Sequence, residues 1–191
     1  EEDCFAPNHP QHIDLGKRII KLTKELWIER NDFMEVPSNK YFRLFPGNQV
    51  RLRYGYVVTC TGFEKDSLGN ITTVFCDYLP NTKSGTQGSD LIKVKGNIHW
   101  VSTKHAIEAT VNLYDRLFKE EQPGSATNNY LDDLNENSIK KVTAKLEENC
   151  LLISPGDQFQ FERHGYFIVD LNSKPLDIQI NRTVTLRDNW Q

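Results

Sequence analysis

The chain has 191 residues, of which 38% are hydrophobic and 26% are charged, and its formal net charge is −3. These values exclude wholesale disorder and allow one ordinary domain or two small ones. The acidic balance disfavours a protein that holds nucleic acid by bulk charge, because such domains usually have a pI above about 9.

Membrane insertion and metal binding are not predicted. No apolar run approaches the ~20 residues of a membrane span. The four cysteines form no CxxC pair, which favours reduced thiols in the cytoplasm. Cys4, His9 and His12 come closest to metal-ligand spacing, but three candidate ligands in a proline-containing segment favour a structural role over zinc.

The first half of the chain indicates short strands separated by turns. The segment around residues 19–28 fits a helical face and a strand equally well, so it stays open. Apolar and aromatic residues recur at every second position over Val50–Cys60, which predicts a strand. The polar segment 65–70 then leads to a β-rich run at 71–76, and together these predict a hairpin. Residues 82–90 are expected to be a flexible connection before a strand at 98–101.

The second half continues the β pattern. A polar break at 120–129 predicts a loop or subdomain joint, and a short helix is expected around Ser138. Period-two patterning returns over Phe159–Phe167, and the run Arg182–Arg187 is again typical of a strand. Turn signals at intervals of about ten residues favour a mainly β fold, a barrel or a sandwich, over βαβ units.

Motifs for catalysis are missing, whereas the distribution of charge is informative. We find no Walker loop, GxGxxG, GxSxG or HExxH pattern and predict no catalytic residue. Between Val36 and Phe63 there is no Asp or Glu, while Lys40, Arg43, Arg51 and Arg53 supply four positive charges. The remainder has 19 basic and 26 acidic residues, or −7, because 23 − 4 is 19.

Two sets of residues could contact RNA. Arg51 and Arg53 are two positions apart, so on a strand both would leave one face about 6.6 Å apart, a spacing similar to that of neighbouring phosphates or bases. The alternative, which composition alone slightly favours, is a solvated strand face with the neighbouring aromatic residues in the core. Gln160 and Arg163 could address a base edge, but a regular strand points them to opposite sides. Their joint use therefore requires a bend, which Gly165 would permit.

Several motifs resemble the anticodon-binding region of glutaminyl-tRNA synthetases. They occur in family order from Pro7 to Trp190 and are highly specific: Pro7–Pro10, Glu25–Arg30 with Asp32 and Phe33, Val50–Arg53, Lys93–Gly96, Ile98–Ser102, Leu113–Phe118, Phe159–Phe167 and Asn181–Arg187.

The resemblance implies two small β-barrels with interleaved strands, approximately at 1–100 and 101–191, that bind the anticodon loop of glutamine tRNA. It assigns Arg51, with Arg53 beside it, to the first anticodon base, Gln160 and Arg163 to the middle uridine, and Arg43 to the third base. Lys40, Phe42 and Gln11 become possible RNA contacts; Phe42 and Gln11 stand where the family is expected to carry Lys and Asn.

The resemblance also implies a parent enzyme, a class I glutamine–tRNA ligase that uses ATP and Mg²⁺ in a separate catalytic domain. The family's nucleotide-binding histidine motif and lysine-containing loop do not occur in these residues, so this segment is expected to bind tRNA without catalysis and without a cofactor. Two alternatives remain: a eukaryotic-type glutamyl-tRNA synthetase, which shares this architecture, and a non-catalytic β-barrel module that binds protein or ribosomal RNA.

Overall fold

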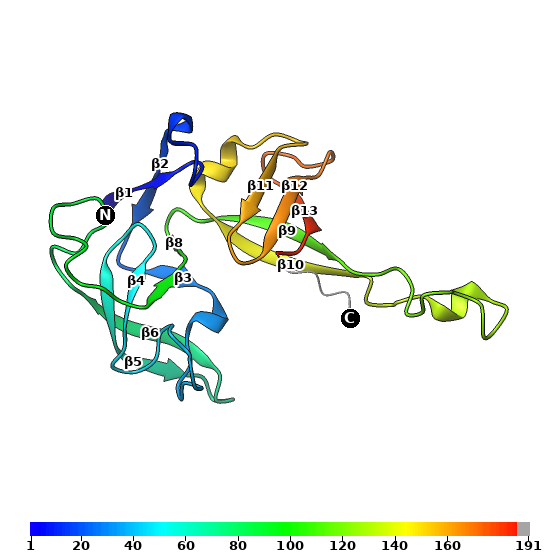
Figure 1. Ribbon diagram of the computed structural model, residues 1–191, viewed down its shortest axis with the longest axis horizontal. Coiled ribbons are helices and arrows are strands. Elements are labelled where there is room, and N and C mark those ends of the chain that lie inside the picture. The colour runs from blue at the N-terminus through cyan, green and yellow to red at the C-terminus, as the bar shows by residue number, and fades with distance from the viewer. Residues whose placement is uncertain (187–191) are drawn as a thin grey trace. The chain divides into compact units, whose positions relative to one another are not determined.

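Strands and short 3₁₀ turns make up the computed structural model, which describes residues 1–186 (Figure 1). Two compact units follow from the contacts within the chain. Unit 1 comprises Glu1–Ala106 and Glu147–Asn149, and unit 2 comprises Ile107–Leu146 and the residues from Cys150 onward. The mainly β class is therefore confirmed. Every helical segment among residues 1–186 is a 3₁₀ turn, at Ile13–Leu15, Arg30–Asp32, Tyr130–Asp133 and Glu148–Leu152.

Unit 1 is built from three open sheets. Its strands are β1 (Glu2–Pro7), β2 (Lys17–Leu22), β3 (Leu26–Ile28), β4 (Gln49–Leu52), β5 (Val57–Lys65), β6 (Ile71–Tyr78), β7 (Gly96–Ile98) and β8 (Trp100–Ser102). Strands β1 and β2 form a hairpin, β3 pairs with β8, and the four-stranded sheet has the order β6-β5-β4-β7. Its buried core contains Phe33, Leu44, Val50, Ile98 and Trp100.

Unit 2 is one five-stranded sheet with the order β10-β9-β13-β12-β11. Its strands are β9 (Ile107–Tyr114), β10 (Ile139–Leu146), β11 (Gln158–Phe161), β12 (Gly165–Val169) and β13 (Ile178–Val184). Alternate residues of β9 and β13, Val111 and Ile180 among them, pack with Phe167 into the core. In the described part of the chain the sheets remain open and do not close into barrels.

A tight turn divides the segment expected to be one strand over Val50–Cys60, so that expectation is wrong. Strand β4 ends at Leu52, β5 begins at Val57, and the amide of Gly55 donates to the carbonyl of Leu52 at 2.7 Å. Tyr54 takes a left-handed φ of 62° in the turn. The alternation of apolar and aromatic residues persists through the turn, which is why the pattern conceals it.

Hairpin β5–β6 confirms the expectation for residues 60–76. The carboxylate of Asp66 accepts from the amides of Leu68 and Asn70 at 2.9 and 2.8 Å and so closes the turn. The segment left open at residues 19–28 forms strands β2 and β3. The run at 98–101 contains the end of β7 and the start of β8, separated at His99.

In unit 2 two expectations need correction. No helix forms around Ser138, because its carbonyl accepts from the amide of Asp115 at 2.8 Å and β10 begins at the next residue. The period-two pattern over Phe159–Phe167 is a hairpin of β11 and β12, whereas one strand was expected. The polar break at 120–129 lies in the connection between β9 and β10, which reaches far out from the sheet (Figure 1). Strand β13 ends at Val184, and Arg187 lies outside the described residues.

Candidate nucleic-acid interface

Arg43 lies just before β4 and neutralises a buried carboxylate. Its Nη1 is 3.1 Å from Oδ1 of Asp32, a side chain with no exposed surface, while the Arg43 side chain keeps 37% of its surface exposed. The same nitrogen donates to the carbonyl of Asn31 at 3.2 Å, and the Asn48 side-chain amide donates to the carbonyl of Arg43 at 2.7 Å. Arg43 therefore has a structural role in unit 1 as well as an exposed surface that a ligand can reach.

The guanidinium of Arg51 organises the loop that follows β6. Its Nη1 donates to the carbonyl of Thr82 at 2.5 Å, and its Nη2 donates to the carbonyl of Ser89 at 2.8 Å. Longer contacts reach the carbonyls of Gly55 and Ile92 at 3.4 Å. All of these acceptors are neutral carbonyl oxygens, so they satisfy the donors without cancelling the positive charge.

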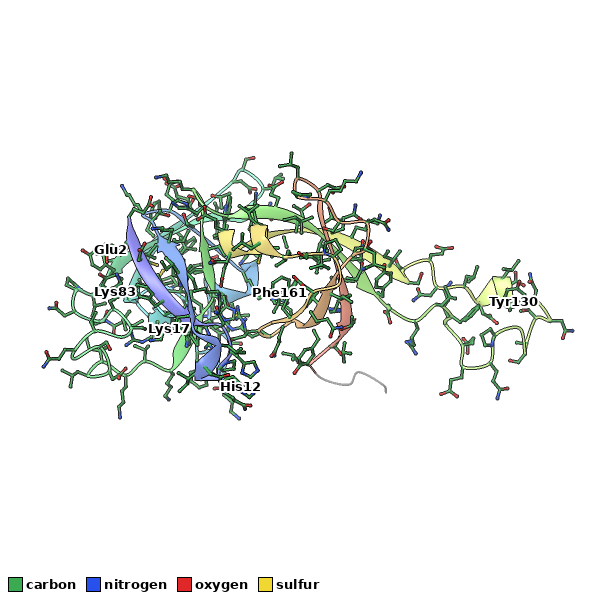
Figure 2. All side chains as sticks on the ribbon, turned by 90° about the horizontal axis from the view of Figure 1, so that it is seen from above. Glu2, His12, Lys17, Lys83, Tyr130 and Phe161 are labelled. Carbon is green, nitrogen blue, oxygen red and sulfur yellow. The ribbon has the colours of Figure 1, made fainter. Side chains whose placement is uncertain are left out.

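A charged pair ties the same loop to the first strand. Nζ of Lys83 lies 2.8 Å from Oε2 of Glu2, which also accepts from the hydroxyl of Tyr56 at 2.9 Å. Figure 2 shows Glu2 and Lys83 side by side. The Lys83 ammonium, followed by the Tyr56 hydroxyl, lowers the pKa of Glu2, and the Glu2 carboxylate raises the pKa of Lys83. The segment 82–90, expected to be flexible, thus has fixed contacts with Arg51 through Thr82 and Ser89 and with Glu2 through Lys83.

Arg53 lies in the turn between β4 and β5 rather than on the strand with Arg51. The shared strand face expected for these two arginines is therefore absent. The Arg53 guanidinium lies over the ring of Tyr54, 5.0 Å from its centroid, and the Arg53 carbonyl accepts from Nε1 of Trp100 at 2.9 Å. The turn presents a cation stacked on an aromatic ring.

Phe42 and Lys95 form an exposed aromatic and cationic pair beside Arg43. The Phe42 side chain is 48% exposed, and Nζ of Lys95 lies 5.1 Å from its ring centroid. Lys95 was not among the expected site residues. Its position directly before Gly96 is the sequence signal that could have indicated its contact with Phe42. A Cβ at Gly96 would lie 2.0 Å from the Phe42 carbonyl oxygen, so only glycine lets β7 pass this close. Lys40 is exposed in the same connection, with a φ of 65°.

The β1–β2 connection holds Gln11, which is exposed. The backbone amides of Gln11 and His12 both donate to Nδ1 of His9 at 3.2 Å, so this imidazole stabilises the loop. Cys4 is buried in the core of unit 1, and among residues 1–186 no group of three His, Cys, Asp or Glu side chains is placed to hold a metal ion.

Gln160 and Arg163 belong to unit 2 and lie at one hairpin. Gln160 is exposed on β11 opposite Tyr166, and Arg163 occupies the turn with a φ of 72°. The bend required for their joint use is thus the turn itself, closed by the amide of His164 donating to the carbonyl of Phe161 at 3.0 Å. A register shift follows between Tyr166 and Phe167.

Each unit therefore presents its own candidate contacts: Arg43, Arg51, Arg53, Phe42, Lys95, Lys40 and Gln11 in unit 1, and Gln160 and Arg163 in unit 2. Guanidinium groups with exposed aromatic rings suit phosphates and unstacked bases, which are features of single-stranded RNA. Within residues 1–186 no helix is long and apolar enough to cross a membrane.

Comparison with known proteins identifies the family. Two family models, both described as the anticodon-binding domain of class I tRNA synthetases (E and Q), match residues 1–79 and 97–170. A glutamine–tRNA ligase of Ralstonia nicotianae is 57% identical over 190 residues, which cover 99% of this chain and 33% of that protein. The corresponding protein of Ralstonia pickettii is 58% identical, with the same coverage.

A more distant glutamine–tRNA ligase, from Bordetella pertussis, is 54% identical over 191 residues, which cover 100% of this chain and 32% of that protein. The chain thus spans about a third of the length of the curated relatives it matches. Together the two family models cover most of the chain, and these relatives match it almost from end to end. This chain belongs to the family of anticodon-binding domains of the class I glutaminyl- and glutamyl-tRNA synthetases, and it matches the anticodon-binding region of glutaminyl-tRNA synthetases.

Proposed function

We propose that this chain reads the anticodon loop of glutamine tRNA for a glutamine–tRNA ligase, and that ligation takes place in the remainder of that protein. In this proposal the catalytic domain, with ATP and Mg²⁺, is the direct partner of the present chain, which is proposed to bind tRNA without taking part in catalysis. Because translation consumes the charged tRNA there, we propose the cytoplasm as the compartment.

The exposed Phe42–Lys95 pair carries the proposal. Phe42, with Arg43 beside it, lies in the segment 36–63 that contains no Asp or Glu. The Phe42 ring offers a stacking surface for an unpaired base, and the ammonium of Lys95 is suited to the adjoining phosphate. Arg43 supplies a guanidinium fork for the edge of a guanine. Since stacking is independent of base identity, we assign selectivity to Arg43, Arg51 and Arg53, and to Gln160 and Arg163 in unit 2.

Binding to a synthetic anticodon stem-loop of glutamine tRNA tests the proposal, with fluorescence anisotropy as the readout. We expect Phe42→Ala to weaken binding by about 1–3 kcal/mol, the usual contribution of one base stacked on an aromatic side chain. Phe42→Tyr keeps the ring and is expected to retain the affinity. Lys119→Ala shows the effect of truncating an exposed side chain of unit 2 that is not among the proposed contacts.

Competitors and salt separate the alternatives. Affinity for the stem-loop should fall steeply as salt rises, because phosphate contacts release counterions. A flat salt response would favour a protein-docking module. Equal or tighter binding of the glutamate stem-loop would favour the glutamyl-tRNA synthetase alternative, and unchanged affinity in Phe42→Ala would contradict the proposed site.

A further inference from the structure

Two cysteines face each other across the β5–β6 hairpin. Cys60 and Cys76 are direct partners in the register of these strands. The amide of Cys60 donates to the carbonyl of Asn48 at 3.0 Å, and its carbonyl accepts from the amide of Gly47 at 2.9 Å. Both backbone groups of Cys60 therefore point away from β6, which makes Cys60 and Cys76 a non-hydrogen-bonded pair.

Such pairs have the closest approach in an antiparallel sheet. Their Cα atoms are about 4.5 Å apart, whereas hydrogen-bonded pairs are separated by about 5.5 Å. Disulfides form between cysteines whose Cα atoms lie about 4.4–6.8 Å apart. Cys60 and Cys76 are paired in this way directly beside a register shift between Cys60 and Gly62. A pair of this kind is close enough for a disulfide to bridge it.

The side chains of Cys60 and Cys76 are also close to each other. The two thiols lie close enough for each to affect the pKa of the other, and the Cys60 thiol donates to the carbonyl of Gly62 at 3.7 Å. Cys60 is buried, whereas Cys76 is exposed as a whole residue although its thiol is desolvated. Burial of the thiol, with the neighbouring Cys60 adding to it, raises the pKa of Cys76 to about 12. Both thiols are thus mostly protonated at neutral pH, and because the thiolate is the reactive form, their oxidation is slow.

We propose that Cys60 and Cys76 form a reversible thiol–disulfide site that is oxidised by small disulfides of the glutathione type. The minor fraction of Cys76 that has lost its proton attacks one sulfur of the small disulfide, which forms a mixed disulfide and expels a thiolate that takes up a proton. The thiolate of Cys60 then attacks the sulfur of Cys76 and expels the second thiol. Two protein thiols are oxidised and one small disulfide is reduced to two thiols.

The bridge would lie next to the proposed RNA site. The backbone of Cys60 holds Gly47 and Asn48, and the Asn48 side chain holds the carbonyl of Arg43. A covalent link at Cys60 fixes the strand on which this connection is anchored. The disulfide chemistry itself does not depend on RNA binding, so its test is separate from that of the proposed function.

Intact mass and peptide mapping of the full chain after exposure to oxidised glutathione test the proposal. We expect the loss of two thiols without a retained glutathione adduct on Cys76, and full reversal by dithiothreitol. Trypsin cleaves after Lys65, between the two cysteines, so the oxidised protein must yield two peptides joined by a disulfide. Oxidation should also raise the urea midpoint of unit 1, because the bridge restricts the unfolded chain.

Matched variants decide the assignment. Cys150→Ser, at the half-buried cysteine of unit 2, is expected to retain the cross-link. Cys76→Ser, at an exposed position, is expected to fold normally and to lose it. A stable glutathione adduct on Cys76 in the unmodified chain would overturn the proposal. So would two unreacted thiols at Cys60 and Cys76 under conditions that fully oxidise free dithiothreitol.

Discussion

Removal of the Arg43 guanidinium should destabilise unit 1, independently of any effect on RNA. The Arg43→Ala change leaves the fully buried carboxylate of Asp32 without this cation. At the observed separation of 3.1 Å, an effective dielectric constant of about 20 gives an attraction of about 5 kcal/mol. Because the Arg43 side chain is 37% exposed, solvent screens part of this attraction, and we expect a net loss of about 2–3 kcal/mol.

Urea unfolding followed by tryptophan fluorescence measures this loss. Trp27 and Trp100 both lie in unit 1, and a Trp190→Phe background removes the third tryptophan of the chain. In that background, adding Asp32→Asn to Arg43→Ala removes both charges and should recover most of the lost free energy of unfolding.

The outcome separates structure from recognition. If Arg43→Ala changes the free energy of unfolding by less than about 0.5 kcal/mol, the buried carboxylate does not need this guanidinium and the reasoning fails. If the double variant is stable but still binds the stem-loop weakly, the remaining defect belongs to the RNA contact. Any binding study of Arg43 therefore requires this stability measurement beside it.

Further predictions follow from single contacts. Gly96→Ala should cost about 1–3 kcal/mol by forcing β7 away from Phe42, measured by urea unfolding, whereas Gly62→Ala, whose added Cβ would meet its nearest atom at 3.9 Å, should be tolerated. Arg51→Lys keeps the charge but not the fork, so limited trypsin digestion of the 79–92 loop should accelerate; an unchanged rate would contradict the organising role of Arg51. The pKa of Asp170 is lowered by the amide of Asn172, so its contribution to stability is present above its ordinary pKa and is lost on acidification. The difference in urea midpoint between Asp170→Asn and the unmodified chain should therefore be constant near neutrality and shrink below about pH 4.

The sequence predicts those features of this fold that depend on local patterning. Alternation of apolar residues and the Asp66–Asn70 turn suffice for the β5–β6 hairpin, because its contacts are close in sequence. The turn at Arg53–Tyr56 escapes detection since Tyr54 and Tyr56 preserve the alternation. The parallel pairings of β4 with β7 and of β13 with β9 join distant segments, and no local pattern specifies them.

The candidate site likewise has features that the sequence shows and contacts that form only on folding. The absence of Asp and Glu over residues 36–63 is visible in the sequence, and it is the basis on which positive charge is predicted there. The partners of that charge are not visible, because Asp32 and the carbonyls around Arg51 are brought in by folding. Lys95 joins Phe42 only because the glycine beside it permits close packing of two backbones.

The short return of the chain to unit 1 at Glu147–Asn149 limits how this protein can be dissected. Arg18 holds Glu147 through two nitrogens, at 2.5 and 2.9 Å, and the Asn149 side chain donates to the carbonyl of Ile19 at 2.7 Å. A fragment cut after residue 106 retains Arg18 but loses the acidic residue that neutralises it. The full contact set of unit 1 is therefore discontinuous in sequence, and residues 147–149 have to be supplied by a grafted linker or by the intact chain to retain it.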